Sequence, residues 1–490
     1  MRRWTVLLFL SMTTGCYDGL RNGARLDGEI EVVASPIGRT PLAAEINLAT
    51  TAPSTARVRL LGDQSSGYET ASRREHTIPV VGLLPDADNR VEVTLSSTEG
   101  TFLVDTFTVA TPPLPDFLPE VVVSVADVAA MEPGWTLSGL SVRDGEEWRT
   151  VPFVFDHQGR IRWYMDLAED GLLVLPIEPL ENGHLIGGAG ERIFEYDWMG
   201  RHADHWRIEG YNFHHDVVEL PDGDLLVAVD KKGLSTVEDF ALVLDRSSGD
   251  IVREIDLRTM MDVSRREVGG NDEDWLHVNS LWYDESDGGI IVSALYQGVF
   301  KISPTNELQW ILAPHRGWGP AGVQGDGPDT SERLLTAVDE SGMPYAADVQ
   351  DGGVPVTGFD WSWYQHAAML TPLGSLLIFD NGVNRNFGVT EDAYSRGVEY
   401  AVDEEEMTVR QLWSYGRERG AEYRSTFISD IDYGPLTGNR LVMPGSTNQG
   451  SAWVTEVTAA GTVVFDAEIR FNIEDGGDLV YRSERIVLPR

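Results

Sequence analysis

Residues 215–233 read HDVVELPDGDLLVAVDKKG, an apolar segment, a turn around Gly223 and a second apolar segment. The same order recurs at 175–201, 278–302, 366–382 and 429–446, and PFVFDHQGRIRWYMDL near residue 153 adds another unit. Each unit predicts two β-strands joined by a glycine-centred turn and followed by outer strands. Six such units arranged radially leave only short, protected sheet edges. The repeat therefore predicts a six-bladed β-propeller over residues 116–490.

Residues 28–112 have a different pattern, a series of short alternating apolar runs such as EIEVVAS, TARVRLLG and NRVEVTLSS. Runs of this kind at a spacing of 8 to 12 residues predict a small β-sandwich of the immunoglobulin or fibronectin type. The segment TPPLP at 111–115 has the stiffness of a linker between two domains. Because no segment has a sustained helical period, we expect an all-β protein with a β-sandwich followed by the propeller.

The composition excludes several classes of function. Of the 490 residues, 78 are acidic and 38 are basic, which gives a net charge of −40 at pH 7. Such a surface repels phosphate backbones, so we expect no nucleic-acid partner. Cys16 is the single cysteine, which excludes an internal disulfide, a cysteine metal site and a thiol enzyme.

The first residues, MRRWTVLLFLSMTTGCYDG, contain two arginines and a short apolar run before Cys16. The run is too short to span a bilayer and predicts a signal peptide at residues 1–15. TTGC at 13–16 resembles a bacterial lipobox, in which the cysteine carries lipid. We therefore expect residues 16–27 to form a lipid-anchor linker and the protein to be a periplasmic or outer-membrane-anchored lipoprotein. An ordinary signal peptide with an incidental cysteine is the alternative.

Three histidines share one register within the repeat. His215 and His366 stand eight residues before the turn glycines Gly223 and Gly374, and His277 stands twelve before Gly289, where DESDG lengthens the turn. The equivalent positions in the other units are Leu175, Asp430 and Ala126. We expect the three histidines to begin the innermost strands of their blades and to converge at one mouth of the central channel. They fit a zinc or iron site, a set of nucleophile and acid/base groups, or buried structural histidines.

Several segments in order resemble the bacterial arylsulfate sulfotransferases. They are FHHD at 213–216, DWLHVNS at 274–280, WILAP at 310–314, QH at 365–366, FDNG at 379–382 and YRSER at 481–485. The resemblance implies transfer of a sulfuryl group from a phenolic sulfate ester to a phenol through a sulfohistidine. It implies a ping-pong mechanism, no cofactor and no nucleotide donor, which agrees with the lack of a phosphate-binding P-loop motif. Whether the protein is a monomer or a homodimer stays open.

The resemblance assigns roles residue by residue. His366 matches the nucleophile, and His277 and His215 match the other two active-site histidines. Asn279, Tyr296 and His214 are expected to contact substrate, and no metal is expected. The family arginine corresponds to Leu295, which cannot hold sulfuryl oxygens as a guanidinium would. Arg385 is the first candidate for the missing charge, and Lys231 is the second.

Leu295 keeps a second function open. A propeller that retained the fold and the histidines but lost turnover would act as a binding or scaffold lipoprotein of the cell envelope. A hydrolase or lyase with a metal held by the three histidines is a third hypothesis. Transfer of sulfate from 4-nitrophenyl sulfate to a phenol, measured with and without a chelator, distinguishes all three.

Overall fold

The computed structural model describes residues 23–62, 68–144, 147–168, 173–388, 394–472 and 478–488. The predicted signal peptide and Cys16 lie outside these residues. The chain forms two compact units. The smaller unit runs to Val32 and includes Ile46–Ile78 and Arg90–Phe107, whereas the larger contains Val33–Glu45, Pro79–Asn89 and Thr108–Arg490. The described residues contain no helix that is long and apolar enough to cross a membrane.

The N-terminal strands pair around one long strand, β2, which contacts β1, β3, β4 and β5, while β5 also pairs with β6. Their bounds are β1 Glu31–Ala34, β2 Ala44–Leu60, β3 Tyr68–Glu69, β4 Arg73–Val80, β5 Asp88–Ser97 and β6 Gly100–Ala110. Alternate residues of β2 and β5 are buried, including the cross-strand pair Val58 and Val93. This period of two is the pattern from which the sequence predicts strands.

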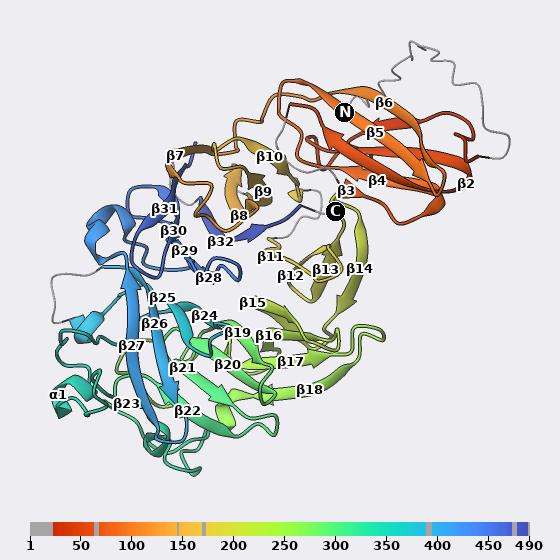
Figure 1. Ribbon diagram of the computed structural model, residues 1–490. Helices are drawn as coiled ribbons and strands as arrows, with labels where there is room; N and C mark the ends of the chain where they lie inside the picture. The colour runs from red at the N-terminus through yellow and green to blue at the C-terminus, as the bar shows by residue number, and fades with distance from the viewer. Residues whose placement is uncertain are drawn as a thin grey trace. The chain divides into compact units, whose positions relative to one another are not determined.

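The rest of the described chain is a six-bladed β-propeller of four- and five-stranded sheets, almost entirely antiparallel and drawn around a common centre in Figure 1. The first three sheets are β32 Leu479–Ile486 with β8 Trp135–Asp144, β9 Glu147–Phe155 and β10 Ile161–Tyr164; β11 Leu175–Pro179 with β12 Leu185–Ala189, β13 Arg192–Tyr196 and β14 His202–Arg207; and β15 Tyr211–Glu219 with β16 Leu225–Lys231, β17 Phe240–Leu244 and β18 Ile251–Asp256.

The other three sheets contain the remaining strands. They are β19 Val278–Asp284 with β20 Gly289–Ala294, β21 Gly298–Ile302 and β22 Leu308–Leu312; β24 His366–Leu370 with β25 Leu376–Asp380, β26 Arg396–Asp403, β27 Thr408–Tyr415 and the parallel strand β23 Thr336–Ala337; and β28 Asp430–Tyr433 with β29 Arg440–Met443, β30 Ser451–Val457, β31 Val463–Arg470 and β7 Glu120–Ala126. The α-helix α1, Ala347–Gln350, lies in the long insertion before β24.

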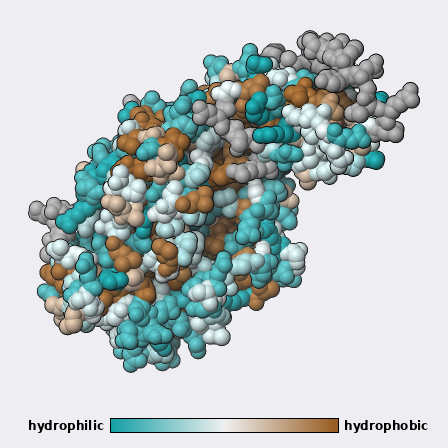
Figure 2. Space-filling model, in the orientation of Figure 1, coloured by the Kyte–Doolittle hydropathy of each residue, from teal (hydrophilic) through white to brown (hydrophobic). Residues whose placement is uncertain are grey.

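The hydrophobic core lies between neighbouring blades. Ile186 and Ile193 of one sheet pack with Val227 and Leu242 of the next, and similar clusters join the following pairs of sheets. Burial on both faces explains why β16 reads as a continuous apolar run, LLVAV. The face shown in Figure 2 is mostly hydrophilic with scattered apolar residues, as the excess of acidic residues predicts.

The ring closes through strands from both ends of the propeller. The C-terminal strand β32 pairs with β8, and β7 joins the outer edge of the last sheet by pairing with β31. A buried hydrogen bond of 2.7 Å between the hydroxyl groups of Ser138 and Ser483 lies across the β8–β32 pair. The C-terminal strand β32 therefore closes the ring of blades. The placement of Ala126 at an inner-strand start is wrong, because β7 is the outermost strand of the last blade. The inner strand of the first blade, which contains β8, β9 and β10, is β32.

Candidate functional site

The three histidines of the shared register lie on or beside three inner strands. His215 lies in β15 at an irregularity between Phe213 and Val217, His277 directly precedes β19, and His366 opens β24. The Nε2 atoms of His215 and His277 are 3.2 Å apart. His366 lies within electrostatic range of His215 and His277. The three histidines therefore come from inner strands of three successive blades, and His215 and His277 are in contact.

The backbone is strained where these side chains are presented. His215, Glu238 and His277 have φ values of +58°, +57° and +59°, and Ala367 beside His366 has +52°. Non-glycine residues rarely adopt this left-handed region, which costs of order 1–3 kcal/mol each. Four such residues around one set of side chains are typical of a site whose geometry is selected for function.

His366 is a buried neutral imidazole. It is 5% exposed, and burial, together with the charge of His277, lowers its pKa to about 3 against the opposing hydrogen bond of Asn381. Its Nδ1 atom lies 2.7 Å from Oδ1 of Asn381. The amide of Asn381 cannot turn over, because its Nδ2 donates to the carbonyls of Ser425 and Ile428. Oδ1 therefore accepts the Nδ1 proton, which leaves the lone pair of His366 on Nε2.

His277 has the opposite character. Its Nδ1 atom lies 2.7 Å from Oε2 of Glu238 and 2.9 Å from Oδ2 of Asp274. Burial alone would lower the pKa of His277, but hydrogen bonds with Asp274 and Glu238 and their charges raise it to about 9. Burial opposes ionisation of Glu238 as well, yet contacts with His214 and His277 lower the pKa of Glu238 to about 2. His277 is therefore an imidazolium at neutral pH beside a neutral His366.

His215 joins His277 to the closing strand. Burial and the charges of the neighbouring histidines place the pKa of His215 well below its ordinary value. Its Nε2 atom lies 3.2 Å from Nε2 of His277, and its Nδ1 atom is hydrogen-bonded to the hydroxyl of Tyr481 on β32. The sequence pattern assigned no role to Tyr481. The YRSER segment and the inner position of β32 are the signals that could have found it.

The predicted substrate contacts Asn279, Tyr296 and His214 all lie near these histidines. Buried Asn279 donates through Nδ2 to the carbonyl of Gln365, 2.8 Å away, and its Oδ1 has no hydrogen-bond partner in the described part of the chain. The ring of Tyr296 stands edge-on to those of His277 and Tyr364, at centroid distances of 5.7 and 5.4 Å. His214 lies 2.9 Å from Glu238 through Nε2. Tyr296 and Tyr364 offer aromatic faces beside the histidines.

Arg385 does not supply the missing charge. Its guanidinium is buried and contacts Oδ2 of Asp360 at 2.7 Å and Oδ2 of Asp380 at 2.8 Å. It also lies over the ring of Tyr394. The sequence could not reveal this, because Asp360 reaches Arg385 only through the folded chain. Arg385 is therefore a structural residue of its blade, and the prediction that it contacts substrate is wrong. Lys231 pairs with Glu254 at 2.6 Å.

Replacement of Arg385 by methionine tests this structural role. Arg385→Met leaves the carboxylates of Asp360 and Asp380 buried without this cation, so we expect the free energy of unfolding to fall by about 3–5 kcal/mol. Unfolding of the protein in guanidinium chloride measures the change in the free energy of unfolding. Arg470→Met is the matched control, because Arg470 is half exposed in its pair with Glu468 and should cost less than about 1 kcal/mol. Equal stability of the two variants would contradict the assignment.

Arg482 follows Tyr481 on the closing strand. Its Nη1 lies 2.9 Å from Oδ1 of Asp216 and also contacts Glu178, while Nη2 donates to the carbonyl of Asn279. Oδ2 of Asp216 accepts the backbone N–H of Leu281 at 2.7 Å. Arg482 thus ties strands β11, β15 and β19 to β32, and its charge is balanced by carboxylates.

One group of described residues could supply ligands to a metal ion. His214, His215, Glu238 and His277 each offer one donor atom, and these atoms lie within 4.8 Å of one another. His366 is not a member, so the group differs from the set of three histidines considered in the sequence. Among the described residues, Oε2 of Glu238 and Nε2 of His214 have no hydrogen-bond partner, although the two atoms lie 2.9 Å apart.

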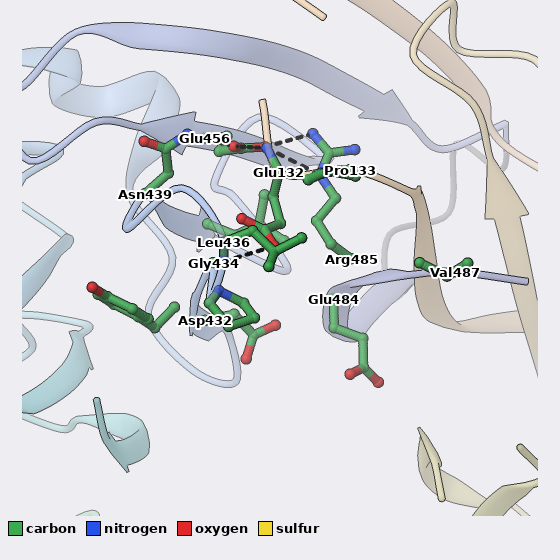
Figure 3. A pocket seen from close by; sticks show the side chains of 13 residues that line it. Glu132, Pro133, Asp432, Gly434, Leu436, Asn439, Glu456, Glu484, Arg485 and Val487 are labelled. Carbon is green, nitrogen blue, oxygen red and sulfur yellow. Dashed lines mark hydrogen bonds and ion pairs between the residues drawn. The ribbon is translucent and has the colours of Figure 1, made fainter. Parts of the chain in front are cut away.

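A separate cavity of about 530 Å³ lies at the C-terminal ends of the inner strands β28 and β32. Its wall carries carboxyl groups of Glu132, Asp432, Glu456 and Glu484 beside Arg485, and Figure 3 shows Glu456 joined to Arg485. No histidine lines it. The cavity is therefore distinct from the site predicted by the repeat.

Two family models match most of the chain. A family model described as Arylsulfotransferase (ASST) matches residues 125–482, and a second, described as Arylsulfotransferase Ig-like domain, matches residues 31–112. The protein named Arylsulfate sulfotransferase AssT from Escherichia coli O6:H1 (strain CFT073) is 30% identical over 340 residues, which cover 57% of this chain and 55% of the relative. The protein of that name from Lelliottia amnigena gives the same identity and coverage.

The match therefore spans about half the length of these curated relatives. Among solved structures, a protein of unknown function from Bacteroides caccae has 12% identity and a TM-score of 0.43, and the match covers 72% of this chain and 98% of that one.

Proposed function

Because the chain belongs to the arylsulfotransferase family, we propose that it moves a sulfuryl group from a phenolic sulfate ester to a phenol through a covalent intermediate on His366. One observation carries this proposal above the others. His366 is held neutral with its Nε2 lone pair free, within electrostatic range of His277, which is held protonated. A nucleophile and a proton donor of opposite protonation state are what a ping-pong transfer between two phenols requires.

In the first half-reaction, Nε2 of His366 attacks the sulfur of the donor in line with the leaving oxygen. The N–S bond forms, the S–O(aryl) bond breaks, and its electron pair passes to the phenolic oxygen. His277 gives its Nε2 proton to that oxygen, so a neutral phenol leaves. His366 keeps its Nδ1 proton, which it donates to Oδ1 of Asn381, and carries the sulfuryl group on Nε2.

In the second half-reaction the same groups act in reverse. The acceptor phenol attacks the sulfur, its proton passes to the now neutral His277, and the S–N bond breaks to restore His366. A phenol has a pKa near 10, and the pKa of His277 is about 9. Because the pKa of this imidazole is so close to that of the phenol, His277 can serve as the acid in one half-reaction and as the base in the other.

The assay that tests the function uses 4-nitrophenyl sulfate and phenol without nucleotide or metal. We expect release of 4-nitrophenol that depends on phenol, together with formation of phenyl sulfate, measured by absorbance and chromatography. A chelator should leave the rate unchanged, because the proposed steps use protein side chains alone. Release that is lost to the chelator and restored by zinc would overturn the mechanism.

A scaffold role is the alternative that Leu295 favours. Leu295 is buried, and its backbone N–H donates to the carbonyl of His277. An apolar residue therefore lies beside His277 at the position where the family has an arginine. The paired protonation states of His366 and His277 favour turnover instead, because a scaffold has no need of them. Inactivity across a panel of aryl sulfates would support the scaffold.

We also propose that Cys16 carries lipid and anchors the protein at the cell envelope. The support is the order of sequence features at 1–16, an arginine-led apolar run and then TTGC. Metabolic labelling with a palmitate analogue should mark the wild-type protein and not Cys16→Ser. A wild-type protein without label would contradict the anchor and leave the proposed chemistry unaffected.

A further inference from the structure

We propose that four side chains at the histidine site, those of His214, His215, Glu238 and His277, form a binding site for a divalent transition-metal ion, with zinc as the ion that fits them best. This set differs from the three histidines of the repeat register, because it lacks His366 and includes His214 and Glu238. Binding of the ion does not depend on the proposed function. One consequence does depend on it: zinc on His277 occupies a group that the transfer needs, so zinc should inhibit the transfer.

The donor atoms are spaced like the ligands of one tetrahedral ion. Each residue offers one such atom, and these atoms lie within 4.8 Å of one another. From Oε2 of Glu238, Nε2 of His214 is 2.9 Å away and Nδ1 of His277 is 2.7 Å away. Nε2 of His215 lies 3.9 Å from the same oxygen. Ligands at about 2.0–2.1 Å from a tetrahedral zinc ion lie about 3.3–3.4 Å apart, and the observed separations fall on both sides of that value.

Two of these atoms are buried and lack a hydrogen bond. Within the part of the chain that the structure describes, Nε2 of His214 and Oε2 of Glu238 have no hydrogen-bond partner, although they lie 2.9 Å apart. A buried polar atom without a partner is costly. Two such atoms that approach closely without being aligned with each other are directed at a common point beside them. An ion at that point satisfies the imidazole nitrogen and the carboxylate oxygen together.

The backbone of β15 brings two consecutive imidazoles together. Consecutive side chains of a regular strand point to opposite faces. At the irregular register of β15, His215 has a φ of +58°, and the ring centroids of His214 and His215 lie 3.9 Å apart. Glu238 and His277 have φ values of +57° and +59°. Three of the four proposed ligands therefore adopt a left-handed conformation that non-glycine residues rarely adopt.

The chain anchors Glu238 beside the histidines. The N–H of Glu238 donates to Oδ1 of Asp230 at 2.6 Å. Its carbonyl accepts the N–H of Val278, the residue after His277, at 3.0 Å. The proposed transfer assigns no step to Glu238 or to His214. A metal ion accounts for the placement of both, since each supplies a ligand directly.

The donor set selects the class of ion. Three imidazole nitrogens and one carboxylate oxygen suit zinc and its neighbours in the first transition row, whereas calcium and magnesium prefer oxygen ligands. The four side chains are between 12% and 26% exposed, so an ion can reach them from solvent. The net charge of −40 also draws cations toward the protein.

Zinc counting tests the site in the whole protein. The purified chain is freed of metal with a chelator, equilibrated with zinc chloride, desalted and measured by plasma mass spectrometry. We expect one zinc ion per chain in the wild type and no retention of magnesium or calcium. In competition with a chromophoric chelator, His214→Asn and Glu238→Gln should weaken zinc binding by at least about 100-fold, since loss of a ligand costs no less than loss of a ligand's outer hydrogen-bond partner.

Two further variants define the members of the group. His184→Asn is the matched control, because partly exposed His184 pairs with Glu195 at 2.6 Å outside the group, and it should retain zinc. His366→Asn should also retain one zinc ion, because His366 supplies no ligand. A wild type that retains no zinc, or folded ligand variants that bind it as tightly as the wild type, would overturn the site. An equal loss of zinc in His184→Asn would show adventitious binding only.

Cobalt substitution reports the geometry of the ligands. Tetrahedral Co²⁺ absorbs visible light far more strongly than octahedral Co²⁺ bound to surface carboxylates and water. We expect the strong absorption in the wild type and in His184→Asn, and its loss in His214→Asn and Glu238→Gln. A weak, octahedral spectrum in the wild type would contradict the four-ligand site.

Activity separates this inference from the proposed function. A nitrogen of His277 that binds zinc is not available to a phenol, so saturating zinc should slow transfer by about 100-fold, the loss expected without general acid–base catalysis. Removal of the zinc with a chelator should restore the rate of the metal-free protein. A chain that binds one zinc ion but transfers no sulfate in either state would refute the proposed function and support the site. Unchanged transfer with zinc bound would remove His277 from the site.

Discussion

His366→Asn removes sulfuryl transfer, with a loss of at least about 10,000-fold in kcat. Asparagine keeps a polar side chain in this buried position but offers no lone pair comparable with that of imidazole Nε2. Steady-state release of 4-nitrophenol measures turnover, and the absence of a burst in the variant shows that the first half-reaction is lost.

The control for His366→Asn is the same substitution at His205. His205 lies exposed on β14, the outermost strand of its blade, and should change turnover less than about 2-fold, within about 0.5 kcal/mol. Both variants should give the circular dichroism of the wild type. A His366→Asn protein that is folded and fully active would refute the assignment of the nucleophile.

His277→Asn slows both half-reactions by about 100- to 1,000-fold, because it removes the group that gives and takes the phenolic proton. The wild-type rate should fall as the pH rises through about 9, since the pKa of His277 is raised to that value and its proton is lost above it. The variant should lack this limb. As the pH falls below 6 the rate should stay constant, because the pKa of His366 is lowered to about 3 and the nucleophile remains neutral.

The role of His277 is tested most sharply by the pH profile of kcat with phenyl sulfate, a donor with a poor leaving group. Bell-shaped profiles report the groups that act as acid and base in the enzyme–substrate complex. A basic limb near 9 that persists in His277→Asn would show that another residue supplies the proton. That outcome would contradict the role of His277 as proton donor and would leave the assignment of His366 as nucleophile unaffected.

Much of the fold could be predicted from the sequence because a propeller repeats. The turn glycine fixes a register in each unit, and counting back from Gly223, Gly289 and Gly374 is enough to place three histidines beside the channel. The same counting fails at Ala126. There the strand belongs to the outer edge of a sheet, since the inner strand of the first blade comes from the C-terminus.

The charged partners could not be predicted in this way. Glu238 lies in a loop between β16 and β17, where no repeat position marks it, and its link to His277 exists only after folding. Asp274 stands three residues before His277 in DWLHVNS, but the spacing alone does not show that the carboxylate turns toward the imidazole. The prediction for Arg385 failed for a similar reason, because the sequence does not show that Asp360 and Asp380 neutralise it.

The covalent intermediate is the central claim, and intact-mass measurement after incubation with 4-nitrophenyl sulfate alone tests it most directly. Without an acceptor, the sulfuryl group should stay on the protein, so we expect one added sulfuryl group per chain that disappears when phenol is added. Peptide mapping should place it on His366, and His366→Asn should remain unmodified. A wild-type protein that turns over with no adduct, or with the adduct on another residue, would contradict the account.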